Sequence, residues 1–297
     1  KPALGFAARA SGEPSAIARC LLLPPGFEDA PSKLAGAIDF ALGAQSTSLL
    51  RVGLRVSATS GQTELALWTR PGPCERGFVA KVLASALPTT SLVRVLATGE
   101  KKSREVKRVE VLSGKGHWRE TLGGLPFRVS APSFFQVNSA AAQILVERVL
   151  DALDAKGRRV ADLYCGVGTF TLPLAQRASS LVAAELASSS IRDLRRNLAT
   201  LKLDVEVLTG DVGRSLEGLT DIEVAVVDPP RGGLDLAVVE ALSNSDTRSL
   251  VYVSCDPTTL ARDARRLIER GWRLTEAQPI DLFPQTWHVE SLGRFVR

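Results

Sequence analysis

The sequence from Ser139 onward predicts an α/β domain with a doubly wound, mostly parallel sheet, and the part before it predicts a smaller α+β domain. Helix-like and strand-like segments alternate after Ser139, as in repeated βαβ units. Five acidic or thiol side chains stand at or just past predicted strand ends, where doubly wound sheets bind ligands. We expect one domain over residues 1–130 and a ligand-binding domain over residues 131–297. The five strand-end residues are Cys165, Glu185, Asp211, Asp228 and Cys255.

The first domain is predicted to be rich in β-structure with some helix. Its strand-like segments are SLLRVGLRVSA, TELALWTR and SLVRVLATG, with Gly and Pro between them. The stretch GHWRETLGGLPFRVSAPSFFQVN is rich in turn residues and leads into the second domain.

The second domain is predicted from its periodicity, with apolar residues at helical spacing in some segments and short apolar runs in others. The last two strands are expected to form an antiparallel pair that closes the sheet. In chain order we expect helices over residues 139–153, 170–177, 188–201 and 234–243 and after Asp256, and strands over residues 158–165, 180–186, 205–211, 222–230, 249–255, 271–283 and 288–296.

The composition is that of a globular protein without a membrane span. Of 297 residues, 45% are hydrophobic and 23% charged, and no apolar run reaches the ~18 residues that a membrane helix needs. The chain begins at Lys1 and has no methionine, so we expect a processed or trimmed chain; no export leader is visible. We expect a cytoplasmic protein.

The charge of the chain hints at a polyanionic partner. The net charge is +5, and five basic residues gather between Glu100 and Arg108. This run is either a solvated surface or a contact to an RNA backbone. Its basic residues are Lys101, Lys102, Arg104, Lys107 and Arg108.

The cysteines argue against a metal site formed by this chain alone. The four of them, Cys20, Cys74, Cys165 and Cys255, are scattered, and the two histidines, His117 and His288, are not near them in sequence. A complete zinc site is therefore not expected. Reduced thiols fit a cytoplasmic location.

The segment DLYCGVGTF joins a strand to a helix through a glycine turn. Gly166 and Gly168 allow backbone amides to approach a ligand closely. Thr171 occupies the third glycine position of a dinucleotide fingerprint, which argues against a nicotinamide cofactor. Glu185 ends the next strand and suits ribose hydroxyls, a pattern that also occurs in adenosylmethionine sites. The alternative is a tight turn without a ligand.

The segment VVDPPRGG places Asp228 at another strand end. Its two prolines stiffen the turn and remove amide donors. Such a motif also occurs in nucleic-acid methyltransferases, but those that modify exocyclic amines usually carry an aromatic residue where Arg231 stands here. The alternative is an ordinary β–α loop.

Cys255 and Glu290 are the candidate reactive residues. Asp256 and Pro257 suit a helix start, so the Cys255 thiol is expected beside a helix N-terminus that favours the thiolate. That fits a nucleophile, although a small buried residue at a strand end is the alternative. Glu290 lies in a mostly apolar strand and is either a general base or a salt-bridged edge residue.

Five motifs together resemble the RNA (uracil-C5)-methyltransferase family: SFFQVN, DLYCGVGTF, DPPRGG, VYVSCDPTTLARD and DLFPQTWHVE. They occur in family order between Ser133 and Glu290. The N-terminal segments PALGFAARASG and ARCLLLPPGFED extend the likeness to the 23S rRNA enzymes of the RlmC type. The resemblance implies a class I, Rossmann-like methyltransferase fold with a smaller RNA-binding α+β domain.

The resemblance also implies residue roles. Cys255 would add to C6 of uracil, C5 would take a methyl group from S-adenosyl-L-methionine, and Glu290 would accept the C5 proton. Thr169 departs from the pattern, since several relatives have Asn there. Asp211 is an adenine-side candidate, and Gln136 is also a candidate for contacting the base. The positions matching the cofactor lining are Gln136, Tyr164, Thr169, Glu185 and Asp228, with Asp211 added.

Two further features follow from the resemblance. Cys20 matches the fourth ligand of an iron–sulfur cluster whose other three ligands precede this chain's first residue in the RlmC type, so Cys20 is an orphaned ligand or a relic and no cluster is expected. No stretch resembles a TRAM domain. The target uracil must be flipped out or taken from a loop, and Phe134 and Phe135 either line its slot or pack in the core.

The sequence leaves alternatives open. Modification of 23S rRNA is expected ahead of tRNA, although the missing cluster cysteines and TRAM domain also suit tRNA-type enzymes. A non-catalytic RNA-binding relative is disfavoured by the intact Cys255 and Glu290. A nicotinamide-dependent dehydrogenase is disfavoured by the missing third glycine and the Asp-Pro-Pro loop. We expect a monomer with RNA as its partner and no membrane contact.

Overall fold

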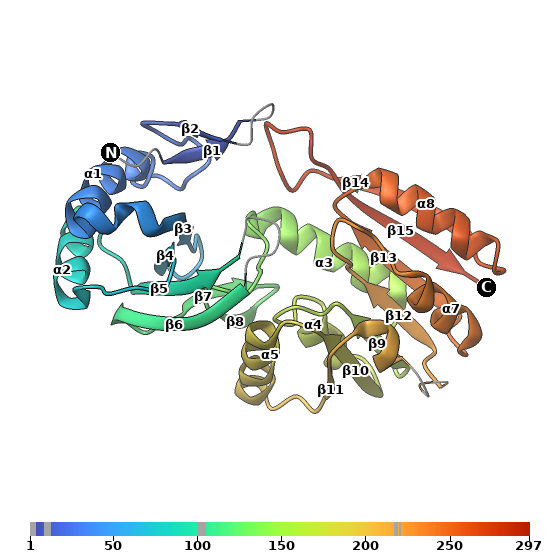
Figure 1. The fold of residues 1–297 in the computed structure, drawn as a ribbon. Coiled ribbons are helices and arrows are strands. Elements are labelled where there is room, and N and C mark those ends of the chain that lie inside the picture. Colours follow the sequence, from blue (N-terminus) through green and yellow to red (C-terminus); the bar gives the residue numbers. More distant parts are fainter. Residues whose placement is uncertain (1–3, 9–12, 100–104, 217–218, 220) are drawn as a thin grey trace. The chain divides into compact units, whose positions relative to one another are not determined.

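The chain folds into two compact units, seen in the computed structural model of Figure 1. The structure describes residues 4–8, 13–99, 105–216, 219 and 221–297. The first unit comprises Lys1–Glu120 and Val129–Pro132, and the second comprises Thr121–Arg128 and Ser133–Arg297. Lys101, Lys102 and Arg104 of the basic run lie outside the described residues.

The first unit contains a four-stranded sheet with two helices against one face. The strand order is β3-β4-β5-β6, in which only the β4–β5 pair is parallel, because helix α2 crosses between those two strands. Apolar residues of both helices and the two central strands form the core of this unit, including Ile38, Leu67, Leu83 and Leu92. The elements are β1 (Gly5–Ala7), β2 (Pro14–Ala16), α1 (Ala30–Leu42), the 3₁₀ helix η1 (Gly43–Ser48), β3 (Leu49–Val56), β4 (Thr63–Thr69), α2 (Arg76–Ala86), β5 (Ser91–Thr98) and β6 (Glu105–Gly114).

A hairpin connects the units in sequence. Strands β7 (Trp118–Leu122) and β8 (Leu125–Val129) flank Gly123 and Gly124, which both have positive φ (58° and 77°), as a tight two-residue hairpin turn requires. The sequence predicts this stretch only as rich in turns; the paired strands are an addition from the structure.

The second unit is built on a seven-stranded sheet with the order β11-β10-β9-β12-β13-β15-β14. The first five strands are parallel, and β15 runs antiparallel to both of its neighbours. This confirms the predicted doubly wound sheet with an antiparallel pair at its end. The elements are α3 (Ser139–Leu153), β9 (Arg159–Leu163), α4 (Thr171–Ala175), β10 (Ser180–Glu185), α5 (Ser188–Leu201), β11 (Glu206–Thr209), α6 (Val212–Ser215), β12 (Val224–Val227), α7 (Leu236–Asn244), β13 (Ser249–Ser254), α8 (Pro257–Ile268), β14 (Arg273–Ile280) and β15 (Glu290–Val296).

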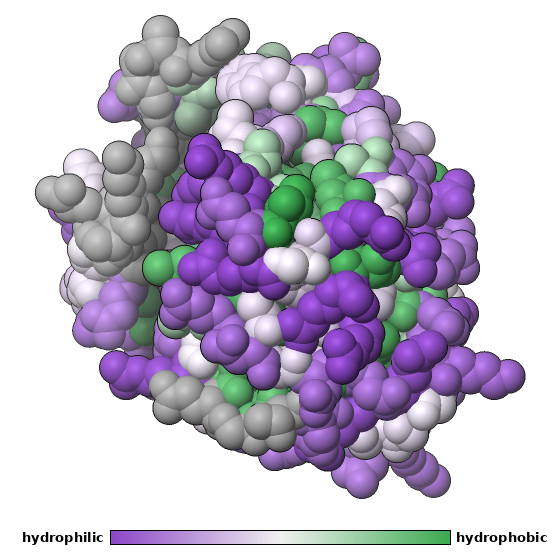
Figure 2. All heavy atoms as spheres, turned by 90° about the vertical axis from the view of Figure 1, so that its right-hand side faces the viewer, coloured by the Kyte–Doolittle hydropathy of each residue, from purple (hydrophilic) through white to green (hydrophobic). Residues whose placement is uncertain are grey.

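Helices cover both faces of this sheet. Residues of α6, α7 and α8 pack with alternate strand residues such as Val227 and Tyr252 in one buried cluster. Helix α3 contacts β12, β13 and β15, and α5 contacts β10 and β11. Figure 2, seen from the side on which α7 and α8 lie, shows a mostly hydrophilic surface with broken hydrophobic areas, as expected for amphipathic helices whose apolar side faces the sheet. Within the described residues, no helix is long and apolar enough to cross a membrane.

Gly114, at the end of β6, provides a test of the first unit. A Cβ at this residue would lie 2.1 Å from the backbone carbonyl oxygen of Thr90, and φ is +76°. Gly61 also has positive φ (+64°), but a Cβ there meets nothing within 4 Å. We therefore expect Gly114→Ala to lower the free energy of unfolding by about 2 kcal/mol more than Gly61→Ala, because a backbone clash adds to the same backbone strain. Urea unfolding of both variants measures this difference, and equal losses would contradict the packing at Gly114.

Candidate active site

The carboxyl ends of the five parallel strands meet at one edge of the second unit's sheet. Glu185 is the last residue of β10, Asp228 follows β12, and Cys255 follows β13. From β9 the chain adds β10 and then β11 on one side of β9. It then crosses to the other side of β9, where β12 and β13 follow. In doubly wound sheets, this reversal of strand order opens a ligand-binding crevice. The glycine turn follows β9, and the Asp-Pro-Pro loop follows β12.

Cys255 lies between β13 and α8, as predicted. Asp256 caps the helix, because its Oδ1 accepts hydrogen bonds from the amides of Thr258 (2.9 Å) and Thr259 (3.4 Å), and Pro257 occupies the first turn. The Ser254 hydroxyl donates to the Asp256 carbonyl oxygen at 3.0 Å. These local bonds fix the backbone on both sides of a thiol that is half-buried.

Glu290 reaches the same edge from the opposite strand direction. Because β15 runs antiparallel to β13, its start meets the end of β13, and Ser291 pairs with Ser254. Glu290 is 3% exposed, and burial raises the pKa of its carboxyl group to about 7. Strand β15 lies between β13 and β14, so Glu290 is not on an edge strand.

The Cys255 thiol is less acidic than its helix position predicts. Burial raises its pKa, and the charge of Glu290 raises it further, with a smaller contribution from Asp228. The Arg231 guanidinium opposes this shift through its charge and a hydrogen bond to the thiol. The expectation that the helix N-terminus favours the thiolate is therefore corrected: the pKa of Cys255 is raised, with desolvation as the largest cause.

A hollow of about 240 Å³ opens at the thiol. Two of the residues that line it are aromatic: His288 contacts Trp287, with ring centroids 5.0 Å apart, and also contacts Phe283, at 5.9 Å. Trp287 is 66% exposed. Sequence reasoning assigned no role to Arg231, Trp287 or His288, although they flank Asp228 and Glu290 in sequence. The hollow is lined by Arg231, Cys255, Asp256, Pro257, Trp287, His288 and Val289.

The glycine turn after β9 has the backbone of a ligand-binding loop. Tyr164, Gly166 and Gly168 all have positive φ (64°, 58° and 101°), and a Cβ on Gly166 would meet nothing within 4 Å. Glu185 organises the loop, because its carboxylate accepts hydrogen bonds from the amides of Gly166 (2.9 Å), Leu186 (2.8 Å) and Ala187 (2.6 Å). The open face of Gly166 therefore leaves room for a ligand next to the Glu185 carboxylate.

The acids at this edge are suited to a cationic ligand. Asp162 is fully buried, and burial raises its pKa to about 7 despite a hydrogen bond from the Thr171 hydroxyl (2.5 Å). Its Oδ1 has no hydrogen-bond partner among the described residues. Burial and the charge of Glu290 also hold the pKa of Asp228 well above its usual range. A positively charged group would relieve this accumulation of buried carboxylates.

The remaining predicted site residues lie in varied surroundings. Gln136 is buried just before α3. Asp211 is exposed and caps α6, accepting from the Arg214 amide at 3.1 Å. Thr169 lines a second hollow, beside Phe127 and Pro173, rather than the one at Cys255.

Four other residues singled out in the sequence also lie in the described part of the chain. Phe135 packs on Phe127 in the core, with ring centroids 5.4 Å apart, whereas Phe134 is 63% exposed. Cys20 is buried, and no cluster of three metal-binding side chains occurs in the part of the chain that the structure describes. Lys107, from the basic run, is paired with Glu105 at 2.6 Å.

The match to known proteins covers most of the second unit. A model of the family described as tRNA (Uracil-5-)-methyltransferase matches residues 123–296. The chain belongs to this family. Proteins with similar sequences include an uncharacterized RNA methyltransferase of Chlorobaculum tepidum, 36% identical over 70% of this chain and 43% of the relative. Another from Gloeobacter violaceus is 35% identical over 84% of this chain and 55% of the relative. The chain thus spans about half the length of these relatives.

A solved structure of a family relative extends the likeness to both units. It is the Pyrococcus abyssi tRNA (uracil-54, C5)-methyltransferase in complex with S-adenosyl-L-homocysteine, at a TM-score of 0.78 and 25% identity. The alignment covers 99% of this chain and 73% of that one. The second unit therefore has the Rossmann-like fold of adenosylmethionine-dependent methyltransferases, as predicted.

The buried Glu290 predicts a pH-dependent stability difference. Its pKa in the folded state, about 7, lies above the ordinary value of 4.5, so its contribution to stability is full at low pH and disappears as pH rises through about 7. Glu290→Gln has no such loss. The stability of the variant relative to the wild type should rise by about 2–3 kcal/mol between pH ~5 and ~8. Urea unfolding at both pH values measures it; a difference that stays constant with pH would show that Glu290 titrates normally.

Proposed function

We propose that this chain is an S-adenosyl-L-methionine-dependent methyltransferase that forms 5-methyluridine in RNA, with 23S rRNA as its substrate. The observation that carries the proposal is the meeting of a half-buried thiol and a buried carboxyl group of raised pKa at the ligand-binding edge of the sheet. Family membership supports the choice of uracil C5 as the methylated position.

The thiol of Cys255 would activate uracil C5 for methylation. Uracil C5 is a poor nucleophile, and addition of the Cys255 sulfur to C6 makes C5 carbanion-like. Burial raises the pKa of the thiol, and the positive charge of Arg231 lowers it and would stabilise the attacking thiolate once the thiol proton has passed to solvent through the hollow.

Glu290 completes the cycle. After C5 has gained its methyl group, the carboxylate accepts the C5 proton, the electron pair of that C–H bond re-forms the C5–C6 double bond, and the Cys255–C6 bond breaks. A carboxyl group with a pKa of about 7 can both accept and return a proton near neutral pH. The loss of this proton is what frees the enzyme from its substrate.

The cofactor would occupy the crevice between the ends of β9 and β12. S-adenosyl-L-methionine, when bound, supplies a methyl group activated by its positively charged sulfonium. The open backbone at Gly166 and the carboxylates of Glu185 and Asp228 suit its ribose and its positive charge. Gln136, Tyr164, Thr169 and Asp211 are the further proposed cofactor contacts, with Gln136 also a candidate for the base.

The hollow at Cys255 is the proposed entrance for the target base. A stacked uracil cannot present C6 to a half-buried thiol, so the base must leave its stack or come from a loop. The exposed Trp287 ring and the Arg231 guanidinium lie beside the thiol, where they would stack on and orient an extruded nucleotide. The first unit, with Lys107 and Arg108 on β6, is proposed to contact the RNA backbone.

The choice between RNA substrates rests on two different observations. The segment around Cys20 resembles the 23S rRNA enzymes of the RlmC type. The second candidate, modification of tRNA, is favoured by the structural likeness to a tRNA (uracil-54, C5)-methyltransferase over nearly the whole chain. Neither substrate requires a different mechanism at Cys255 and Glu290.

Transfer of labelled methyl from adenosylmethionine to separate 23S rRNA and tRNA transcripts tests the proposal. We expect 5-methyluridine in 23S rRNA with the wild type. Cys255→Ala should abolish product, and Glu290→Gln should lower turnover by about 10²–10⁴-fold while leaving RNA attached through Cys255 in a denaturing gel. The attachment is expected because the Cys255–C6 bond breaks only after the proton has left.

Cys74→Ala is the matched control, because Cys74 is a partly buried free thiol in the first unit and should leave transfer unchanged. Product only in tRNA would replace the substrate and keep the mechanism. RNA binding without transfer to either transcript would favour a non-catalytic RNA-binding relative.

A further inference from the structure

Asp263, in the middle of α8, is a buried carboxylate with several hydrogen-bond donors around it. It is 0% exposed. Its Oδ2 accepts hydrogen bonds from the Leu234 amide (2.8 Å) and the Tyr252 hydroxyl (2.9 Å). Its Oδ1 accepts from Arg262 (2.9 Å) and Arg266 (3.1 Å). A buried carboxylate with this many donors is tightly fixed in orientation.

These contacts tie three segments together. Tyr252 lies on β13, the strand that leads to Cys255, and Asp263 lies on the helix that follows Cys255. Leu234 ends the loop that begins at Asp228. The carboxylate therefore joins both flanks of the thiol to the Asp-Pro-Pro-Arg-Gly-Gly loop.

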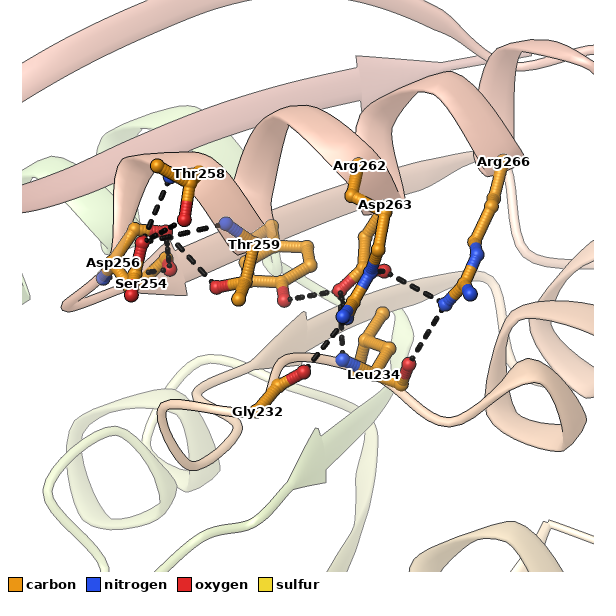
Figure 3. A network of polar contacts seen from close by, with 10 residues as sticks. Gly232, Leu234, Ser254, Asp256, Thr258, Thr259, Arg262, Asp263 and Arg266 are labelled. Atoms are coloured by element: carbon orange, nitrogen blue, oxygen red, sulfur yellow. Dashed lines mark hydrogen bonds and ion pairs between the residues drawn. The ribbon is translucent and has the colours of Figure 1, made fainter.

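The arginines beside Asp263 hold the same loop, as Figure 3 shows. Arg262 donates to the Gly232 carbonyl oxygen at 2.7 Å, and Arg266 donates to the Leu234 carbonyl oxygen at 3.4 Å. Gly233 packs so closely that a Cβ there would lie 2.3 Å from Asp263 Oδ2. This close approach, together with a φ of +77°, gives a physical reason for glycine at position 233, whereas a Cβ on Gly232 would meet nothing within 4 Å.

Arg231 stands in the middle of the loop that is held in this way. Arg231 and Cys255 line the same hollow, and the charge of the guanidinium lowers the pKa of the thiol. The Arg231 side chain is exposed, so the backbone of the loop that carries it sets where the guanidinium can reach. We propose that Asp263 is a positioning residue that clamps the Asp228–Leu234 loop to α8 and thereby keeps Arg231 on the thiol of Cys255. This inference rests on the proposed role of Cys255 as nucleophile.

The readout is the reactivity of Cys255 itself. The groups that face this thiol are Glu290 on β15 and Asp228 and Arg231 in the loop, and Asp256 and His288 line the same hollow. Of these, Arg231 is the one that lowers the thiol pKa through both charge and a hydrogen bond. Loss of its contact should raise the thiol pKa and move the alkylation of Cys255 to higher pH.

The experiment is alkylation of the purified chain by iodoacetamide over a range of pH, with modification of the Cys255 peptide measured by mass spectrometry. We expect Arg231→Gln to move the midpoint upward by about one pH unit, and Asp263→Asn to move it by a similar amount. The double variant should show no further shift, because both substitutions remove the same contact. An unchanged midpoint in a folded Asp263→Asn variant, or additive shifts in the double variant, would overturn the proposal.

Two other variants separate positioning from general stability. Asp193 is also a fully buried carboxylate of the second unit, near Arg196 on α5, so Asp193→Asn should lower thermal stability without moving the midpoint. Arg262 is partly exposed and holds only the Gly232 end of the loop, so Arg262→Gln should fold and give a smaller upward shift. If Asp263→Asn does not fold, Arg262→Gln becomes the deciding variant. An unchanged alkylation midpoint in Arg262→Gln would then overturn the proposal that Asp263 clamps the loop.

The measurement needs neither cofactor nor RNA. A shift shared by Asp263→Asn and Arg231→Gln therefore supports the clamp even where methyl transfer is not observed. Absence of methyl transfer, in turn, bears on the proposed function and leaves the alkylation result standing.

Discussion

The antiparallel pairing of β15 with β13 is the constraint on which the candidate site depends. The five strands on the β13 side of β15 run parallel, so their carboxyl ends bring Glu185, Asp228 and Cys255 to one edge. A sixth parallel strand would have delivered its last residue there. Because β15 runs the other way, it delivers its first residue, Glu290, to the flank of the thiol. The reversal of one strand therefore supplies the site with its second reactive group.

Burial then gives these groups their chemical character. Asp162, Asp228 and Glu290 all have raised pKa values, and desolvation is the first cause in each case. Their mutual repulsion adds to the shift at Asp228. An edge of this kind attracts positive charge, which agrees with a sulfonium cofactor. The thiol of Cys255 has the opposite need, because it must become an anion, and the positive charge of Arg231 favours that anion.

Much of this architecture could be predicted from the sequence, where local signals dominate. Helices α3 and α5 begin and end at the predicted residues, because their apolar spacing is regular. The cap at Asp256 is a contact between near neighbours and was also predictable. The parallel direction of the strands was predicted from the alternation of helix and strand. The positions of Asp228 and Cys255 at one edge followed from that shared direction, whereas the order of the strands comes from the structure.

The sequence could not reveal features that depend on distant contacts. The register of β15 against β13 joins residues about forty positions apart, and no local pattern specifies it. The direction of the Cys255 pKa shift was wrong for the same reason: the helix dipole is visible in the sequence, but burial beside Glu290 is not. Asp263 also escaped notice, since an Asp within a helix is ordinarily exposed, and only the packing of α8 on β13 and the Asp228–Leu234 loop buries it.

The most direct test of the account is the fate of the hydrogen at uracil C5. A transcript labelled with tritium at C5 of uridine is incubated with the chain and adenosylmethionine, and tritium in water is compared with methyl groups in RNA. The account predicts one tritium released for each methyl group gained, with both lost in Cys255→Ala. Methyl transfer that leaves the tritium on the RNA would contradict it, because the methyl group would then lie on another atom and neither Cys255 nor Glu290 would have the proposed role.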